Sequence, residues 1–311
     1  MAKDPSDKRI YGLIGYPVKH SLSPRMHNDA FQTLNINAEY RLFEVKPEEL
    51  EGFLLKNIPV QDTKGESFFS QDIVGFNITI PHKVRACEIL LPAGEVFVKN
   101  ITTRQDHYVF LSGAINTAKR DSDKLYYYNT DASGFLESLE KDLEFNTKNK
   151  NILIFGCGGA GRAVVAALTW EDSGIKKIWV YDPNKEAIKC AIKHFERFDF
   201  VREKLEFLFS EEQIPEKIKD CALLVNASPI GMEEGDGSVI DKSLLHKNLS
   251  VYDVVYNRQT QLIKDAESSG RPAKNGLGML LYQGVEAFKF WTGQGAPVEV
   301  MHKALMEAIN K

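Results

Sequence analysis

The arrangement of apolar and polar positions in the first half of the chain predicts short strands that alternate with helices. The apolar runs that indicate strands lie at residues 9–15, 39–45 and 73–80. Helices are expected over residues 24–34 and 84–91, with a further one from residue 46 onward. In the first of these helices, Met26, Ala30 and Leu34 recur every four residues and therefore share one face. Residues 91–112 match neither the 3.6-residue period of a helix nor the two-residue period of a strand.

A polar run at residues 146–150 separates this half from a second half with a different pattern. Residues 151–155, Asn-Ile-Leu-Ile-Phe, form an apolar run of the kind that is buried on both faces of a parallel sheet. Further strands are expected at residues 177–181, 222–226 and 249–255, and helices at residues 278–291 and 298–309. This alternation predicts a doubly wound α/β domain with right-handed crossovers.

Length, composition and charge narrow the class of protein. A chain of 311 residues is long for a single hydrophobic core, so two domains are expected. An apolar fraction of 43% and a charged fraction of 26% are ordinary for a globular protein and exclude a disordered or fibrous one. The net charge of −4 offers no electrostatic footprint for nucleic acid or an anionic membrane. This charge does not exclude an anionic small-molecule substrate, because a local pocket can be cationic on an acidic protein.

The N-terminal segment and the cysteines indicate the compartment. Residues 1–9 are polar and lack the apolar core of a secretory signal. The most apolar long stretch, residues 152–170, is interrupted by glycines and by Arg162, which argues against a membrane span. The four cysteines are scattered singly, without the clusters that zinc or a disulfide framework requires. We expect a cytoplasmic protein that binds no metal.

A glycine-rich segment, Gly-Cys-Gly-Gly-Ala-Gly, lies between a predicted strand and a predicted helix. Glycines at such a turn let a diphosphate approach the backbone N–H groups of a helix N-terminus. Asp182 ends the next predicted strand, where a carboxylate can reach the adenosine ribose. The alternative is a tight turn without a ligand, but the context favours a dinucleotide. The expected binding residues are Gly156, Gly158, Gly159, Ala160, Gly161 and Asp182.

Polar residues also gather in the sequence His20-Ser-Leu-Ser-Pro24. Ser21 and Ser23 point the same way if this segment is extended. Ser23 is well placed as a helix N-cap, with Pro24 at the first helical position. Two hydroxyls beside a helix N-terminus can bind a carboxylate, although an ordinary capped helix explains the same residues.

Two further segments carry candidate acid–base groups. In Asn77-Ile-Thr-Ile-Pro-His-Lys83, alternation places Asn77 and Thr79 on one face of a strand that Pro81 stops. Lys83 then follows at the strand end, where a lysine can exchange a proton with a ligand or can simply be a solvated surface charge. Asp131, after Tyr128-Asn-Thr, is either a catalytic carboxylate or a helix N-cap.

Together these segments make the chain resemble the shikimate/quinate dehydrogenase family. The matching segments, in the family's order, are residues 11–17 with 20–24 and 26–27, 75–83, 113–117, 129–131, 156–163, 226–232, 252–257 and 276–283. The resemblance implies an N-terminal α/β substrate domain completed by C-terminal helices, and a Rossmann dinucleotide-binding domain. The implied bounds are residues 1–130 with 284–311 for the substrate domain and residues 131–283 for the Rossmann domain.

The resemblance also implies roles for individual residues. The implied substrate ligands are Ser21, Ser23 and Tyr256 for a carboxylate, and Thr79, Asn116 and Gln283 for ring hydroxyls. Lys83 and Asp131 are implied to form the catalytic pair. When hydride reduces a ketone, Lys83 would supply the proton and Asp131 would orient the lysine. Val254 and Gly276 are implied to contact the cofactor, with Gly276 at the nicotinamide.

The implied activity is the reversible reduction of 3-dehydroshikimate to shikimate, a step towards chorismate and the aromatic amino acids, by a monomer or homodimer. Quinate dehydrogenase is the main alternative. A ligand-sensing homologue without catalysis would not need both Lys83 and Asp131. A folate-type methylene dehydrogenase, which shares the architecture, would not need residues 20–24.

Two features depart from the commoner family pattern. Family members that use NADP usually carry Asn-Arg-Thr or Asn-Arg-Ser after the second Rossmann strand, whereas this chain has Asp182-Pro-Asn-Lys185. The Asp182 carboxylate would repel a 2′-phosphate, so NAD is the expected cofactor, with NADP possible through Lys185. The segment of residues 91–112 is also longer than expected, which suggests a surface insertion or a substrate-side lid.

Overall fold

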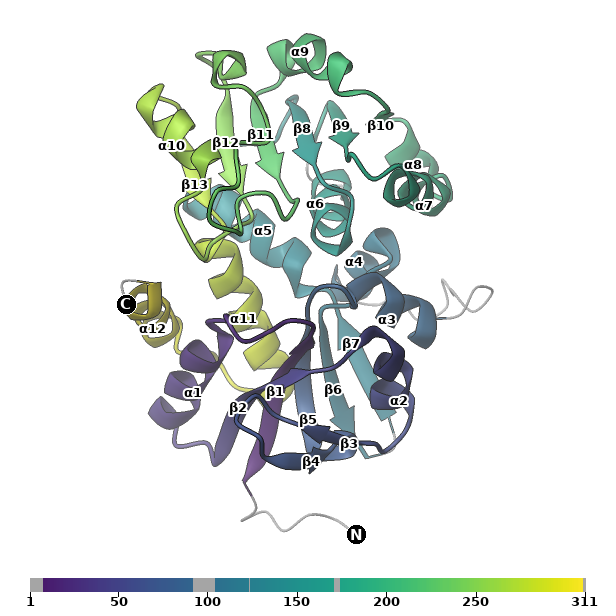
Figure 1. Ribbon diagram of the computed structural model, residues 1–311, viewed down its shortest axis with the longest axis vertical. Coiled ribbons are helices and arrows are strands. Elements are labelled where there is room, and N and C mark those ends of the chain that lie inside the picture. Colours follow the sequence, from purple (N-terminus) through teal and green to yellow (C-terminus); the bar gives the residue numbers. More distant parts are fainter. Residues whose placement is uncertain (1–7, 92–103, 123, 171–173, 310–311) are drawn as a thin grey trace. The chain divides into compact units, whose positions relative to one another are not determined.

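The computed structural model describes residues 8–91, 104–122, 124–170 and 174–309 and divides into two compact units. The first unit contains residues 1–130 and 283–311, and the second contains residues 131–282. The division falls within two helices, α5 (Thr130–Lys141) and α11 (Leu277–Thr292). Each unit is a sheet covered by helices, so the predicted α/β fold class is confirmed (Figure 1).

The first unit is built on a five-stranded sheet with the order β2-β1-β5-β6-β7. Its strands are β1 (Arg9–Gly15), β2 (Ala38–Glu44), β5 (Ile73–Ile78), β6 (Thr117–Asp121) and β7 (Lys124–Tyr128). Strand β1 pairs parallel with β2 and β5, whereas β6 pairs antiparallel with β5 and β7. A separate hairpin joins β3 (Pro59–Gln61) and β4 (Ser67–Phe69). The three apolar runs of this half are strands as predicted, although β5 ends two residues before the expected Ile80.

Helices cover both faces of this sheet. They are α1 (Ser23–Thr33), α2 (Leu50–Leu55), α3 (Lys83–Leu90), α4 (Arg104–Ser112), α12 (Val298–Ile309) and the later part of α11. Alternate residues of the strands divide between two cores. One core joins Ile14 and Phe76 to α2, α3 and α4, and the other joins Tyr11 to Phe31 of α1 and Trp291 of α11.

Helix α4 occupies part of the segment that the pattern left unassigned. Val109 and Leu111 of α4 are buried, and Val109 belongs to the first of these cores. This part of the segment is therefore not a surface insertion, which corrects that expectation. Residues 92–103, the rest of the proposed insertion or lid, lie outside the described residues.

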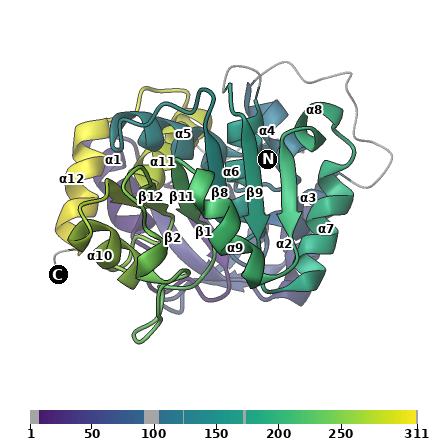
Figure 2. The same cartoon turned by 90° about the horizontal axis from the view of Figure 1, so that it is seen from above.

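The second unit is built on a six-stranded, entirely parallel sheet with the order β10-β9-β8-β11-β12-β13. Figure 2 shows β12, β11, β8 and β9 in a row in this order. The strands are β8 (Asn151–Phe155), β9 (Lys177–Tyr181), β10 (Leu205–Leu208), β11 (Leu223–Asn226), β12 (Ser250–Asp253) and β13 (Ala273–Asn275). The order reverses between β8 and β11, which is where ligands bind in doubly wound folds.

The central strands of this sheet are buried on both faces, as their sequences predict. In β8, Leu153 packs in a core with α9 and α10, while the equally buried Ile152 and Ile154 point to the opposite face. The helices of the unit are α6 (Gly159–Thr169), α7 (Lys185–Phe195), α8 (Asp199–Arg202), α9 (Ile214–Lys217) and α10 (Gln261–Ser268). Continuous apolar runs thus identified the four central strands correctly, whereas β10 and β13, at the two edges of the sheet, were not predicted.

Candidate active site

The predicted substrate ligands of the first unit gather at one edge of its sheet. Strands β1 and β5 are parallel, so the segments that follow them leave from the same edge. Because β6 is antiparallel to β5 and pairs Thr117 with Asn77, the residue before β6 also lies at this edge. The register of β7, which pairs Tyr128 with Thr117, brings the segment after Tyr128 there too. This topology accounts for the clustering of four separate motifs.

Ser21 and Ser23 lie together after β1. Their Oγ atoms are 3.2 Å apart, and the backbone N–H of Ser23 donates to the Ser21 Oγ at 3.3 Å. The predicted capping role of Ser23 is wrong, because α1 begins at Ser23 and its N-cap is Leu22, already in helical conformation. Pro24 is consequently at the second helical position. The Ser23 hydroxyl is not bonded to the helix backbone as a cap.

Thr79 and Lys83 lie after β5. The backbone N–H of Thr79 donates to the Ile14 carbonyl at 2.9 Å, which ties this segment to the end of β1. Lys83 is half-buried and is the first residue of α3. Its carbonyl accepts from the Ile115 N–H at 2.9 Å, so the loop before β6 lies against the start of α3. The neighbouring Asn77 is buried and bonded to Tyr40 and Thr117, which gives it a packing role.

Asn116 and Gln283 are hydrogen-bonded to each other. The buried Asn116 Nδ2 donates to Gln283 Oε1 at 3.0 Å and to Thr130 Oγ1 at 3.0 Å. The Asn116 Oδ1 accepts from the backbone N–H of Thr130 at 2.7 Å. The structure therefore brings together two predicted substrate ligands that are far apart in sequence. It also fixes Thr130, which precedes the predicted catalytic Asp131.

The alternative role of Asp131 as a helix N-cap is wrong. Helix α5 begins at Thr130, so Asp131 lies inside its first turn, and its side chain is buried. A carboxylate in the first turn is stabilised by the helix dipole. Lys83 belongs to the first unit and Asp131 to the second, so their proposed pairing is treated below as a proposal.

The glycine loop of the second unit follows β8 at the carboxyl edge of its sheet. Gly156 has φ of +94°, and a Cβ there would lie 2.8 Å from the backbone of Ala227 and Ser228. A Cβ on Gly161 would lie 2.1 Å from the Gly156 carbonyl oxygen. A Cβ on Gly158, however, would meet nothing within 4 Å. Two glycines thus permit close packing, and the exposed Gly158 leaves free space at the N-terminus of α6.

This free space fits a dinucleotide diphosphate. Gly158 is the N-cap of α6 and has no side chain to bond the helix N-terminus. The N–H groups of the first helical turn, at Gly159 and Ala160, therefore have no partner within the helix and can bind phosphate oxygens.

Asp182 connects the glycine loop to the segment after β9. One carboxylate oxygen accepts from the Cys157 N–H at 3.0 Å, and the other accepts from the Asn184 N–H at 2.8 Å. Asp182 could instead be a simple turn or N-cap residue. The N-cap of α7 is Asn184, whereas the bond from the Asn184 N–H does give Asp182 a place in a turn. Burial, followed by the Asp182 charge, raises the pKa of the Cys157 thiol to about 12, so this cysteine remains protonated.

Val254 and Gly276 lie in direct contact, after β12 and β13. A Cβ on Gly276 would lie 2.0 Å from the Val254 carbonyl oxygen, so only glycine allows this approach. The half-buried Tyr256 follows two residues after Val254. The segments after β8, β9, β12 and β13 all leave the carboxyl edge of one parallel sheet. That edge is the usual ligand-binding edge of such a sheet.

Two polar residues at the same edge received no role from the sequence pattern. Asn226 ends β11 and Asp253 ends β12, and both are buried. Burial raises the pKa of the Asp253 carboxyl to about 6. A charged residue at the end of an apolar strand was the available signal for Asp253, but its partners come from loops whose course the sequence does not reveal.

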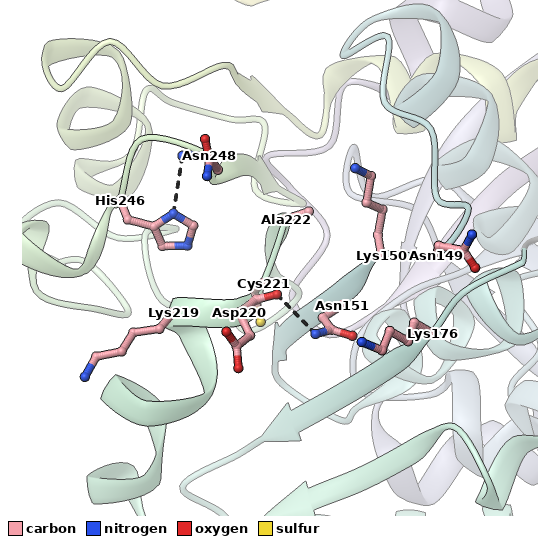
Figure 3. Close-up of a pocket in the computed structure, with 10 residues that line it drawn as sticks. All are labelled: Asn149, Lys150, Asn151, Lys176, Lys219, Asp220, Cys221, Ala222, His246 and Asn248. Atoms are coloured by element: carbon pink, nitrogen blue, oxygen red, sulfur yellow. Dashed lines mark hydrogen bonds between the residues drawn. The ribbon is translucent and has the colours of Figure 1, made fainter.

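A polar hollow of about 730 Å³ lies elsewhere in the second unit (Figure 3). Its lining residues include Asn151 at the start of β8, Ala222 before β11 and Asn248 before β12. The hollow is therefore at the amino edge of the sheet, opposite the glycine loop. Among the described side chains, no group of His, Cys, Asp and Glu is arranged to hold a metal. None of the described helices has both the length and the apolarity needed to cross a bilayer.

Comparison with known proteins gives a consistent family. The model of the shikimate dehydrogenase substrate binding domain matches residues 13–93, and that of the shikimate 5′-dehydrogenase C-terminal domain matches residues 276–306. A shikimate dehydrogenase (NADP(+)) of Methanopyrus kandleri is 36% identical over 308 residues, 98% of this chain and 97% of that protein.

Solved structures agree with this result. The crystal structure of shikimate dehydrogenase from Aquifex aeolicus has a TM-score of 0.75 and 33% identity, and the match covers 96% of this chain and 98% of that one. Shikimate 5-dehydrogenase from Listeria monocytogenes, in complex with shikimate and NAD, has a TM-score of 0.73 and 28% identity over 96% of each chain. Quinate dehydrogenase from Corynebacterium glutamicum, in complex with NAD, has a TM-score of 0.76 and 27% identity, covering 97% of this chain and 99% of that one.

The folds of both units, the glycine loop and the near full-length likeness to these proteins lead to one conclusion: the chain belongs to the shikimate dehydrogenase family.

Proposed function

We propose that this protein is a nicotinamide-dependent dehydrogenase that reversibly reduces 3-dehydroshikimate to shikimate, a step in chorismate and aromatic amino-acid biosynthesis. The observation that carries this proposal is the 36% identity over 98% of the chain to a shikimate dehydrogenase. In this proposal the first unit binds the substrate and the second unit binds the dinucleotide. The matching substrate-binding model within the first unit supports that division.

The polar side chains at one edge of the first unit support the proposed substrate ligands, to which the second unit adds Tyr256. Ser21 and Ser23 hold adjacent hydroxyls that can donate to a carboxylate, and Tyr256 adds a phenol. The substrate's ring hydroxyls are assigned to Thr79, Asn116 and Gln283. Both Nδ2 hydrogens of Asn116 are donated to Thr130 and Gln283, and Oδ1 accepts from the N–H and the hydroxyl of Thr130. A substrate hydroxyl bound by Asn116 would therefore displace one of these bonds. The Gln283 amide nitrogen would act as the donor beside it.

Lys83 and Asp131 form the proposed catalytic pair. A bound nicotinamide supplies or accepts the hydride. Reduction of the substrate ketone develops negative charge on its oxygen, and Lys83 neutralises that charge by donating a proton. In the oxidation direction, Lys83 accepts the proton of the hydroxyl. Asp131 keeps the lysine ammonium oriented, and its own position is set by the hydrogen bonds of Thr130 to Asn116.

The choice between NAD and NADP depends on Asp182. The carboxylate stands after β9, where Oδ2 accepts from both the N–H and the thiol of Cys157. Oδ1 accepts from the Asn184 N–H and keeps a lone pair for a ribose hydroxyl. A 2′-phosphate would bring nearly two negative charges against this carboxylate. We therefore propose that NAD is preferred, with weaker use of NADP through the exposed Lys185. The Methanopyrus relative is named for NADP(+), and the Listeria and Corynebacterium structures hold NAD.

Quinate is the second candidate substrate, because the likeness to the Corynebacterium quinate dehydrogenase extends over 97% of this chain. Shikimate and quinate share the carboxylate and neighbouring hydroxyls, so the same ligands can hold either ring.

A single experiment tests both parts of the proposal. The purified full-length protein is offered shikimate or quinate, each with NAD or NADP, and formation of the reduced nicotinamide is followed by absorbance. We expect the highest kcat/KM with shikimate and NAD. A higher kcat/KM with quinate would reverse the substrate assignment. No turnover with either acid would overturn the proposed activity.

A further inference from the structure

The carboxyl group of Asp253 has an unusual setting at the end of β12. It is fully buried, and no ion pair to it is found among the described residues. An apolar residue here would continue β12 as an ordinary buried strand. Burying a carboxyl without a cationic partner instead costs several kcal/mol unless hydrogen bonds satisfy it. The bonds that Asp253 makes therefore indicate what the residue contributes.

Three donors from three different segments converge on this carboxyl group. Oδ1 accepts from Asn226 Nδ2 at 2.9 Å and from the Val255 N–H at 3.1 Å. Oδ2 accepts from Thr260 Oγ1 at 2.6 Å. Asn226 ends β11, Val255 lies in the loop after β12, and Thr260 is the N-cap of α10. One buried side chain thus joins both loops to the start of a helix.

Asn226 extends this network into the loop after β11. Its Nδ2 also donates to the Ile230 carbonyl at 2.9 Å. Its Oδ1 accepts from the N–H of Ser228 at 3.1 Å and from the Ser228 Oγ at 2.6 Å. The Val254 N–H donates to the Asn226 carbonyl at 2.8 Å, so the two loops are also joined through the backbone. Asp253 completes this network, because it accepts the second Nδ2 hydrogen of Asn226 and also the N–H of Val255 in the loop after β12.

These loops form two contacts with the proposed dinucleotide site. Ala227 and Ser228 pack against Gly156 of the glycine loop, where a Cβ would lie 2.8 Å from their backbone atoms. Val254 packs equally closely against Gly276. The network centred on Asp253 lies between these contacts, at the carboxyl ends of the neighbouring strands β11 and β12 (Figure 1).

We propose that Asp253 is a positioning residue for dinucleotide binding: by joining the loops after β11 and β12, it fixes the wall of the cofactor site that runs from Gly156 to Gly276. The inference rests on the proposed function, because it takes this edge as the cofactor site. Asp253 acts through Ser228 and Val254 and does not itself contact the cofactor. It gives a role to the segment of residues 226–232, which the substrate and acid–base assignments leave unexplained.

The test compares Asp253→Ala with the conservative Asp253→Asn. Asparagine keeps an oxygen for Asn226 and Val255 and offers an N–H to Thr260 Oγ1, whereas alanine removes all three bonds. The matched control is Thr169→Ala, which removes a buried hydroxyl that donates to the Val165 carbonyl at the far end of α6. NAD and NADP binding is measured by the quenching of protein fluorescence without substrate, and kcat and KM are measured separately.

We expect Asp253→Ala to weaken dinucleotide binding by at least about tenfold, because buried donors lose their acceptor and the loops shift. We expect kcat at saturating cofactor to change by less than about threefold, since no reacting group is removed. Asp253→Asn should bind within about threefold of the parent, and so should Thr169→Ala. If Asp253 had only a structural role, Asp253→Ala and Thr169→Ala would both lower the stability of the protein. The KM for the dinucleotide would then not rise while kcat stays the same.

If Asp253→Ala does not fold, Thr260→Val keeps the inference testable, because valine matches threonine in shape and removes the hydroxyl that donates to Oδ2 and that accepts the Ile263 N–H at the start of α10. Weaker dinucleotide binding in Thr260→Val is then expected. Parent-like binding in a folded Asp253→Ala or in Thr260→Val overturns the inference, as does equal weakening by Thr169→Ala. A parent that binds neither dinucleotide also overturns it. A parent that binds a dinucleotide but oxidises neither shikimate nor quinate overturns only the proposed function.

Discussion

Lys83 begins α3 beside the loop that carries Asn116, a position that gives it access to the edge where the substrate ligands gather. We expect Lys83→Ala to lower kcat by about 10²–10⁴-fold, because the developing oxyanion loses its proton donor. Shikimate binding should be nearly unchanged, since other residues hold the carboxylate and hydroxyls. Steady-state kinetics and shikimate binding measure the two effects.

The control for this prediction is Arg85→Ala, which removes an exposed cation two residues further along α3 that pairs with Glu88. Half of the parental turnover in Lys83→Ala would exclude the lysine as the proton donor.

Asp182 offers a prediction about cofactor choice. We expect the parent to prefer NAD over NADP by at least about tenfold in kcat/KM, which requires only about 1.4 kcal/mol. Asp182→Asn removes the charge that opposes the 2′-phosphate and should raise the kcat/KM for NADP. The comparison is parallel kinetics with both cofactors, with the exposed Asp199→Asn in α8 as the control. A parent that prefers NADP would show that Asp182 does not select the ribose.

At the scale of secondary-structure elements, variants at the start of α1 can distinguish substrate binding from helix capping. Ser23 is the first helical residue and makes no cap hydrogen bond, so Ser23→Ala should leave the melting temperature nearly unchanged. Ser21→Ala and Ser23→Ala should instead raise the KM for shikimate, because each loses a hydrogen bond to a charged group worth about 1.5–3 kcal/mol. Thermal unfolding and kinetics are measured together. Parental KM values in both variants would place the carboxylate site elsewhere.

The glycine loop allows a similar separation within one turn. A Cβ at Gly158 enters free space, so Gly158→Ala should fold normally but bind NAD more weakly, because the methyl group takes the space of the diphosphate. A Cβ at Gly161 collides with the Gly156 carbonyl, so Gly161→Ala should lose at least about 1–3 kcal/mol of stability. Calorimetry and dinucleotide titration provide the two measurements.

The control for the glycine pair is Gly237→Ala, since a Cβ there also meets nothing within 4 Å. It should alter neither stability nor binding. Tight NAD binding by Gly158→Ala would contradict the placement of the diphosphate.

The elements differ in how well the sequence predicts them. Strands β8 and β9 are nearly continuous apolar runs, and their bounds were predicted correctly. Strands β6 and β7 were missed because charged residues such as Lys119, Arg120 and Lys124 interrupt their apolar pattern. Arg120 is nevertheless partly buried, where it donates to carbonyls of α2. Helix α1 was predicted one residue late because Ser-Pro is a common cap signal, whereas here Leu22 already has helical φ and ψ.

The candidate site, like the elements, could be predicted only where a local sequence pattern carries the signal. Motifs and spacing made the glycine loop and Asp182 candidates, because a strand, a turn and a helix follow one another in the chain. The contact between Asn116 and Gln283 joins residues that are 167 positions apart, and no local pattern encodes it. The partners of Asp253 likewise come from two loops, so only the fold reveals them.

At the scale of the whole molecule, two buried titratable side chains link stability to pH. Burial lowers the pKa of His27 from 6.5 to about 3, where it stacks on Tyr40 without a hydrogen-bond partner for its ring nitrogens. Between these pH values the unfolded chain binds a proton that the folded chain does not. The free energy of unfolding therefore rises with pH up to about 6.5 through His27. The pKa of Asp253 is raised from 3.8 to about 6, so between these pH values the folded chain binds a proton that the unfolded chain does not. Through Asp253 the free energy of unfolding therefore falls as the pH rises from 3.8 to about 6.

We expect His27→Phe to remove the contribution of His27 while keeping an aromatic ring against Tyr40. In the parent, His27 should raise the free energy of unfolding by roughly 3 kcal/mol between about pH 4 and pH 6.5. The variant should lack this rise. Urea unfolding at a series of pH values measures this difference, and His302→Gln, at an exposed position on α12, is the control. Parallel pH profiles for parent and His27→Phe would refute the burial of a neutral His27.

The division of the chain within α5 and α11 has a consequence for the order in which the protein is made. Residues 131–282 are contiguous, so this unit can fold as soon as it has left the ribosome. The first unit is started earlier but must wait, because α1 packs on α12 and Tyr11 on Trp291, which are translated after the second unit. Until then, the apolar face of Tyr11 and Phe31 stays uncovered in the nascent chain. We therefore expect chaperones that hold nascent chains to bind this face while the second unit is being made.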